Sequence, residues 1–170
     1  MRRQFIETIS DIFRKNNKIV LLLCDIGVFG FRKILKKFPL RAKNIGVLEQ
    51  STISFAAGIS KSGLVPIVHS IAPFLINRAY EQIKIDFGYQ NLPGNIVSVG
   101  GSYDYAGLGS THHCPEDINL VNNIPNINII VPGNSFELNY LFKKSFLNKN
   151  CNYYRLSEYE HSSNIKVRFG

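Results

Sequence analysis

Glu49 is placed where a carboxyl group could exchange a proton with a bound heterocycle. It stands between the apolar run 44–48 and the small-residue segment 50–58, a pattern typical of a strand end followed by a helix. A carboxyl group withdrawn from water there gives up its charge more readily, which suits proton exchange near neutral pH. A glutamate at this position could instead serve only to complement the dipole and the free N–H groups of the helix.

Other side chains capable of chemistry follow apolar runs in the same way. Asp25, Phe74 and His112 each come soon after such a run, and His112 belongs to the glycine-rich loop 107–113. Polar chemistry at three separate strand ends favours a cofactor-activating role for Glu49 over helix capping alone. The loop is a poor match to a dinucleotide-binding fingerprint, since it lacks the third glycine and follows a fourth strand rather than a first.

Short apolar runs alternate with amphipathic segments along the chain. Such runs are typical of strands covered on both faces, and the alternation predicts an α/β fold: a doubly wound, mostly parallel sheet of about six strands with helices on both faces. Ligands bind these sheets outside the carboxyl ends of the strands, where Asp25, Glu49, His69 and the loop 101–115 would gather. The expected strands are 19–23, 45–48, 65–68, 96–99, 127–131 and 153–156, and the expected helices lie around 4–15, 29–37, 51–62, 75–87, 116–123 and 135–148.

The composition fits a single domain over residues 1–170. With 45% hydrophobic and 19% charged residues, a chain of this length can bury one core. No stretch reaches the roughly 20 apolar residues of a membrane helix, and the basic N-terminus leads into an amphipathic segment rather than an apolar signal core. We therefore expect a cytoplasmic protein that does not engage a membrane.

Charge and cysteine content bear on further classes. The formal net charge is +8, but the basic residues are scattered and no nucleic-acid-binding motif accompanies them. No nucleic-acid partner is therefore expected, and an acidic protein partner is the alternative. Cys24, Cys114 and Cys151 form no Cys-x-x-Cys pair, so we expect packed, reduced thiols and no metal site.

Five short motifs occur in a fixed order along the chain. They are Val47-Leu48-Glu49-Gln50; Ala56-Ala57-Gly58; Arg78-Ala79-Tyr80-Glu81-Gln82-Ile83; Thr111-His112-His113 with Glu116-Asp117-Ile118; and Ile124-Pro125-Asn126 with Val131-Pro132. Together they resemble the pyrimidine-binding domain of transketolases, in order and spacing, from about residue 19 to 157. The resemblance is closest to the C-terminal subunits of split transketolases, whose two halves are separate chains.

The resemblance implies thiamine diphosphate as the cofactor and gives the candidate residues their roles. Glu49 would hydrogen-bond the aminopyrimidine ring and favour its imino tautomer, which then removes a proton from the thiazolium carbon. Phe74 would stack on the pyrimidine, with Ile71 as an aliphatic companion where the family has a second aromatic. Asp25 corresponds to an acid near the thiazolium, although it could equally cap a turn. His112 corresponds to the histidine that contacts substrate oxygens, and His69 and His113 are expected to be packed.

The same resemblance implies a partner chain. No Gly-Asp-Gly followed by a distant Asn is present to hold a metal and the diphosphate, and the third transketolase domain is also absent from the sequence. A diphosphate-binding, N-terminal-type subunit would hold Mg²⁺ (or Ca²⁺), and the assembly would be a homodimer or a heterotetramer. The implied activity is transfer of a two-carbon ketol unit between sugars, carried out only with the partner.

Departures from the family pattern fall on sugar-phosphate contacts. Phe29 replaces a phosphate-contacting Ser, Glu158 replaces a phosphate-binding Arg, Leu108 replaces an Asp that recognises a hydroxyl, and Gly100 replaces a substrate-contacting His. Arg155 is not a matched replacement. The acceptor is therefore expected to differ, and a nucleotide-linked sugar is one hypothesis.

Two alternatives stay open. The first is a subunit of another thiamine diphosphate enzyme, of the 2-oxoacid dehydrogenase beta type or resembling deoxyxylulose-phosphate synthase. The second is a non-catalytic assembly subunit or remnant. Retention of Glu49, Phe74 and His112 argues against the second.

Overall fold

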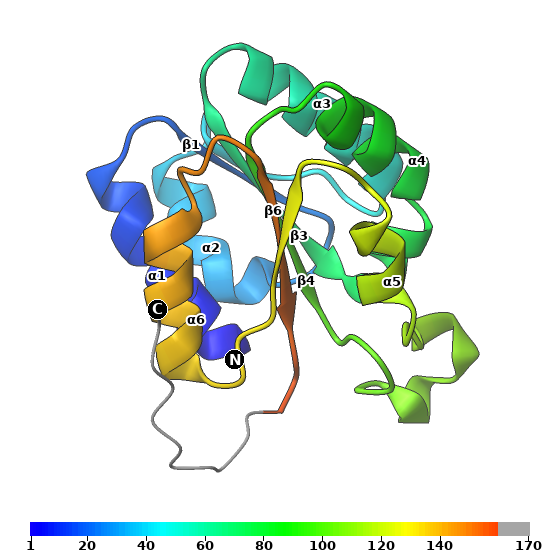
Figure 1. Cartoon of the computed structure of the whole chain (residues 1–170). Coiled ribbons are helices and arrows are strands. Elements are labelled where there is room, and N and C mark those ends of the chain that lie inside the picture. Colours follow the sequence, from blue (N-terminus) through cyan, green and yellow to red (C-terminus); the bar gives the residue numbers. More distant parts are fainter. Residues whose placement is uncertain (160–170) are drawn as a thin grey trace.

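The computed structural model describes residues 1–159, which form one parallel sheet with helices on both sides (Figure 1). The strand order is β2-β1-β3-β4-β6-β5, and each neighbouring pair runs parallel. The predicted doubly wound α/β fold is thus confirmed. The strands are β1 (Ile19–Leu23), β2 (Ala42–Asn44), β3 (Val65–Ile71), β4 (Gly94–Val99), β5 (Ile127–Ile130) and β6 (Cys151–Leu156).

The helices divide between the two faces of the sheet, with α1, α2 and α6 on one and α3, α4 and α5 on the other (Figure 1). Their bounds are α1 (Arg2–Lys15), α2 (Val28–Lys37), α3 (Glu49–Lys61), α4 (Tyr80–Gln82), α5 (Asp117–Asn122) and α6 (Ser135–Ser145). Short π-helical turns η1 (Pro73–Asn77) and η2 (Ile83–Tyr89) flank α4, and 3₁₀ turns η3 (Ala106–Leu108) and η4 (Ser110–His112) lie in the loop after β4. No helix within residues 1–159 combines the length and apolarity needed to cross a membrane.

Alternating side chains of the strands build two separate cores. In β1, Leu21 and Leu23 pack with α1, α2 and α6, whereas Val20 and Leu22 pack with the helices of the other face. The helix α1 buries a matching stripe that includes Phe5, Ile9 and Phe13. Coverage of both faces explains why β1 is an unbroken apolar run and why β3 and β4 are rich in apolar residues.

The prediction of a strand at 45–48 is wrong. The second strand is Ala42–Asn44, and the chain then turns at Gly46, which has a φ of +87° in the left-handed region. Val47 and Leu48 are exposed in the loop that follows. Because β2 is an edge strand paired only with β1, its own residues did not need to be apolar.

The helix predicted at 75–87 is also interrupted. It consists of η1, α4 and η2, so the regular 3.6-residue repeat is broken twice between Pro73 and Tyr89. The first of these turns carries Phe74, and its end carries Arg78. The irregular geometry therefore falls on residues next to the predicted site.

The sheet order creates a natural ligand position. The connection after β1 leads through α2 to the outer strand β2, whereas the connection after β3 leads in the other direction to β4. Parallel sheets bind ligands outside the carboxyl ends of strands at such a reversal. Asp25 follows β1 and Phe74 follows β3, so the two segments flank this point.

Candidate active site

Glu49 is the first residue of α3, and its side chain is only 1% exposed. One carboxylate oxygen, Oε1, accepts a hydrogen bond from Ser70 Oγ at 3.1 Å, and the other, Oε2, lies 2.6 Å from Arg78 Nη1. Ser70 belongs to β3 and Arg78 follows η1, so two neighbouring segments hold the carboxylate. The prediction that Glu49 opens a helix is confirmed, although the loop 45–48 separates it from β2.

Phe74 and His112 lie together beside the Glu49–Arg78 ion pair. Their ring centroids are 5.1 Å apart with the planes at 70°, an edge-to-face arrangement. The guanidinium carbon of Arg78 lies 4.6 Å from the centroid of the Phe74 ring. Glu49, Arg78, Phe74 and His112 therefore form one continuous series of contacts.

Arg78 and Ser70 were not predicted as site residues. Arg78 stood in the sequence as the first residue of a motif, with no role attached to it. A buried carboxylate needs a charged or hydrogen-bonding partner, and that requirement was the available signal. The requirement alone does not say which of the chain's arginines supplies the partner.

Asp25 lies at the end of β1 in a left-handed turn, with a φ of +58°. Its backbone N–H donates to Asn44 Oδ1 at 3.0 Å, and Asn44 Nδ2 donates to Asp25 Oδ1 at 2.7 Å. The side chain is exposed and ties the end of β1 to the end of β2. These contacts describe the turn-forming role that the sequence left open.

Ile71 and His69 both belong to β3 and are buried. Ile71 ends the strand and packs in the core beneath α1, α2 and α6. His69 donates from Nδ1 to the Val97 carbonyl oxygen at 2.9 Å, and its ring centroid lies 4.9 Å from that of Phe5. Burial lowers the pKa of His69 to about 4. The expectation that His69 is packed is confirmed.

The loop after β4 is closed at its base. Ser102 and Cys114 exchange two backbone hydrogen bonds of 2.8 Å. The two ends of segment 103–113, which carries His112, are therefore held side by side after β4. The Cys114 thiol donates to Asn77 Oδ1 at 3.3 Å and connects the loop to η1. This connection positions His112 relative to Phe74.

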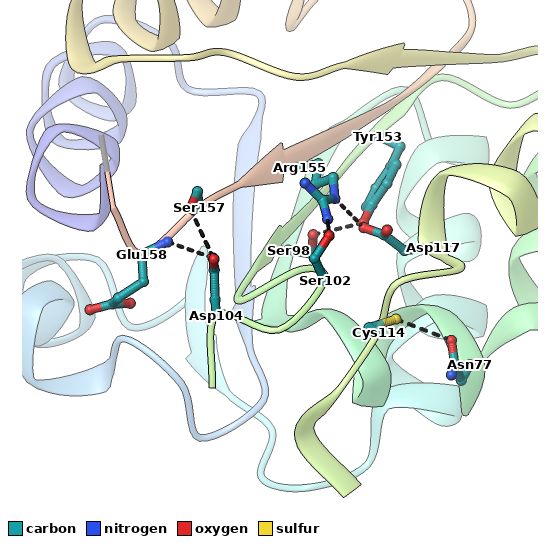
Figure 2. A network of polar contacts seen from close by, with 10 residues as sticks. All are labelled: Asn77, Ser98, Ser102, Asp104, Cys114, Asp117, Tyr153, Arg155, Ser157 and Glu158. Carbon is teal, nitrogen blue, oxygen red and sulfur yellow. Dashed lines mark hydrogen bonds and ion pairs between the residues drawn. The ribbon is translucent and has the colours of Figure 1, made fainter. Parts of the chain in front are cut away.

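A buried polar network fixes the same loop from the other side (Figure 2). Asp117 is fully buried, and its Oδ2 accepts hydrogen bonds from Tyr153 Oη at 2.8 Å and Arg155 Nε at 2.7 Å. Arg155 Nη2 also donates to Ser102 Oγ at 2.6 Å. Burial, reinforced by the Asp117 charge, raises the pKa of Tyr153 well above its usual value. The network ties α5, β6 and the loop base together.

Two carboxylates lie at the carboxyl ends of β4 and β6. Asp104 Oδ2 accepts from the backbone N–H of Glu158 at 2.8 Å and from Ser157 Oγ at 2.9 Å (Figure 2). Glu158 Oε2 accepts from Tyr105 Oη at 2.8 Å and lies 3.6 Å from Arg2 Nε. Asp104 and Glu158 therefore place two carboxylates beside one guanidinium, that of Arg2, where the resemblance implied an arginine at position 158.

Gly100 explains why no larger side chain stands at the end of β4. Its φ is +74°, and a Cβ atom at this position would collide with the ring of Tyr105. The neighbouring replacement Leu108 is 61% exposed in η3, and Phe29 at the start of α2 is 79% exposed. None of these three residues reproduces a polar contact to a sugar.

The cysteine thiols are packed as expected. Cys24, Cys114 and Cys151 are buried and free of disulfides, and burial raises the pKa of Cys24 to about 11. Within residues 1–159, no three His, Cys, Asp or Glu side chains are grouped closely enough to hold a metal ion.

Fold and site together define a doubly wound α/β module with a buried, partnered carboxylate near the carboxyl ends of its parallel strands. Residues 1–159 match the family model described as the transketolase pyrimidine-binding domain, and the chain belongs to this family of thiamine diphosphate enzymes. A solved "split gene transketolase, inactive beta4 tetramer" superposes with a TM-score of 0.84 at 26% identity, covering 99% of this chain and 55% of that chain.

Three curated relatives place the chain among larger proteins. An "uncharacterized 33.6 kDa protein in fasciation locus" of Rhodococcoides fascians is 35% identical over 88% of this chain and 48% of its own length. An apulose-4-phosphate transketolase subunit of Actinobacillus succinogenes is 39% identical over 61% and 33%. A 1-deoxy-D-xylulose-5-phosphate synthase of Natranaerobius thermophilus is 34% identical over 79% and 21%. The chain thus spans about half the length, or less, of these relatives.

Proposed function

We propose that residues 1–170 form the pyrimidine-binding domain of a split transketolase-type enzyme that transfers a two-carbon ketol unit between sugars. The observation that carries the proposal is Glu49, a carboxylate with 1% exposure held at the start of α3 beside Phe74. Such a carboxylate, next to an aromatic face at the carboxyl ends of parallel strands, fits a flat nitrogen heterocycle.

Thiamine diphosphate is the cofactor that suits these residues. Glu49 would hold a proton shared with the pyrimidine ring nitrogen, and Phe74 would stack on the ring. When bound, the cofactor supplies a thiazolium carbon that acts as a nucleophile toward carbonyl groups. His112, which is half-buried at the edge of Phe74, would donate and accept protons at substrate oxygens. Asp25 and Ile71 are proposed to border the cofactor without bonding to its pyrimidine.

A partner chain is proposed to bind the diphosphate and Mg²⁺ (or Ca²⁺), and the assembly is proposed to be a homodimer or a heterotetramer. Exposed apolar side chains surround the carboxyl ends of the strands and support a protein contact there. They come from the segments after β1, β2 and β4, and are Phe29, Val47, Leu48, Tyr103 and Leu108. We also propose a cytoplasmic location, where sugar substrates and this cofactor are available.

The test is calorimetric titration of thiamine diphosphate with Mg²⁺ into this chain, into a candidate diphosphate-binding subunit, and into their mixture. We expect strong binding only in the mixture, and we expect the Glu49→Gln chain to weaken it. Equal binding by the mixture with Glu49→Gln would remove Glu49 from its assigned role. Absence of binding in every sample would favour an assembly subunit or remnant.

A second candidate is a synthase of the deoxyxylulose-phosphate type, favoured by the 34% identity to the relative of that name. The two candidates use different donors, a 2-oxoacid in one case and a ketose in the other. Mixing the assembled enzyme with pyruvate or with a ketose phosphate, in separate assays with one aldehyde acceptor, separates them. Turnover with the ketose alone supports the transketolase assignment.

A further inference from the structure

Arg78 makes two contacts with the residues assigned to the pyrimidine. Its Nη1 donates to Glu49 Oε2 at 2.6 Å, and its guanidinium lies over the Phe74 ring at 4.6 Å. A guanidinium is planar, carries N–H donors and stacks on aromatic faces. These are also the properties by which a protonated pyrimidine ring would be recognised by a carboxylate and a phenyl ring.

We propose that Arg78 competes with the pyrimidine ring for Glu49 and Phe74, and that it must turn away for the cofactor to bind. The inference rests on the proposed function, because it takes Glu49 as the acid that bonds the ring. While the Arg78 guanidinium lies over the Phe74 ring and donates to Glu49 Oε2, a pyrimidine that used the same face of Phe74 and the same side of the carboxylate would overlap with it. Release of Arg78 is therefore a step of cofactor binding.

The different burial of Arg78 and Glu49 decides which of the two moves when the pyrimidine binds. The Arg78 side chain is 39% exposed, so its charge can be taken up by water with little reorganisation. Glu49 is buried and is also held by Ser70, so it stays in place. An ionised carboxylate left alone in such a site is strongly unfavourable. Replacement of one donor by another keeps Glu49 partnered throughout.

Competition lowers the affinity for the pyrimidine. A binding-competent arrangement that is only fractionally populated reduces the apparent affinity by that fraction. Loss of the Arg78 contact should therefore strengthen binding, by about tenfold for a charged hydrogen bond of this kind. The partner chain would have to supply enough additional binding to displace Arg78.

The experiment uses the full chain and thiamine, which contains the pyrimidine and thiazolium rings without the diphosphate. Dissociation constants are measured by NMR titration for the unaltered chain, Arg78→Gln and Arg78→Lys. Arg78→Gln keeps an amide donor but removes the cation and the planar fork, and is expected to bind thiamine about tenfold more tightly. Arg78→Lys, a point charge without the fork, is expected to lie between the two.

Arg41→Gln is the matched control. The Arg41 guanidinium lies 4.5 Å from the Phe13 ring, so this variant also removes an arginine from an aromatic face, but immediately before β2 rather than beside Glu49. It should leave thiamine binding unchanged. The Arg78 side-chain ¹⁵N–¹H signals of the unaltered chain provide a readout that needs no variant. Saturation with thiamine should shift them to positions typical of a solvent-exposed guanidinium.

The outcomes separate this inference from the proposed function. Thiamine binding that is lost in Glu49→Gln but is no tighter in Arg78→Gln would overturn the competition while leaving Glu49 as the binding acid. Unshifted Arg78 signals at saturation would do the same. Thiamine binding that does not depend on Glu49 would overturn both, and absence of thiamine binding even in Arg78→Gln would overturn the competition alone.

Discussion

Arg155 Nε lies 2.7 Å from Oδ2 of the fully buried Asp117, and this ion pair joins the end of β6 to the first residue of α5. The same guanidinium donates to Ser102 at the base of the loop that carries His112. A residue outside the proposed cofactor contacts therefore determines where the loop is fixed. The pair serves the fold and the site together.

Removal of Arg155 should destabilise the protein strongly. Arg155→Met leaves the Asp117 carboxylate buried with Tyr153 as its remaining hydrogen-bond donor, and we expect a loss of about 3 kcal/mol in the free energy of unfolding. Urea denaturation measures it. Arg3→Met, which removes an exposed pair with Glu7, is the control and should change stability by less than about 0.5 kcal/mol. Similar losses in the two variants would contradict the structural role of the network.

Glu49→Gln should lower turnover of the assembled enzyme by a factor of about 100 or more, because an amide cannot share a proton with the cofactor ring in the same way. The side chain has the same shape and still contacts Ser70, so circular dichroism should show a folded chain. Glu7→Gln, on the exposed face of α1, is the matched control. Full activity of Glu49→Gln in steady-state assays would show that another group activates the cofactor.

His69 should make the protein less stable in mild acid. Its pKa is about 4 in the folded chain and about 6.5 when unfolded, so between these values only the unfolded state takes up the proton. The contribution is complete above about pH 6.5 and is lost as the pH falls toward 4, by about 3 kcal/mol. His69→Gln should remove this part of the pH dependence. Parallel stability curves for the two proteins between pH 4 and 7 would show that His69 is not responsible.

The Glu158 carboxylate should affect the choice of acceptor. Glu158→Gln keeps an oxygen for Tyr105 but removes a charge, so we expect KM for a phosphorylated acceptor to fall about threefold with little change for a neutral one. High salt should reduce the difference. Asp86→Asn, beside Ser54 on α3, provides a control charge change away from β6. Equal effects on both acceptors would mean that Glu158 does not face the substrate.

Leu108→Asp tests the hydroxyl contact that the family places at this position. The side chain is exposed, so a carboxylate can be introduced at little cost to stability. We expect turnover of unmodified ketoses to increase by a few-fold, as measured by kcat/KM, since one hydrogen bond contributes about 1 kcal/mol. No gain with any ketose would argue that η3 lies outside the acceptor site.

The central strands were predictable from the sequence because both of their faces are buried. Val65–Ile71 and Gly94–Val99 each contain a short, mostly apolar run, at 65–68 and 96–99, that is typical of a strand covered on both faces. The edge strand β2 was not predictable, since two of its three residues are exposed while the apolar residues 45–48 belong to a loop. A run of apolar residues predicts burial, and a strand at the edge of a sheet need not be buried.

For the site, the sequence indicated which residues gather at the carboxyl ends of the strands. It did not indicate which side chains bond to one another there. Glu49, Phe74 and His112 were predicted from the apolar runs that precede them and from the family resemblance, and the structure places them in one series of contacts that also includes Arg78. Arg78 itself follows an irregular π-helical turn, and its direction depends on packing rather than on a repeat. The choice between a turn and a cofactor contact for Asp25 likewise needed the position of Asn44.

The bridge between Ser102 and Cys114 makes segment 103–113 a self-contained insert, because the chain enters and leaves the sheet edge at neighbouring points. Segments of this kind can change in length and sequence without moving the strands that carry them. Segment 103–113 also depends on residues outside it, because Asp104 and Tyr105 form hydrogen bonds with Ser157, Glu158 and Arg2. An exchange of this loop between homologous domains would therefore have to include those three positions as well.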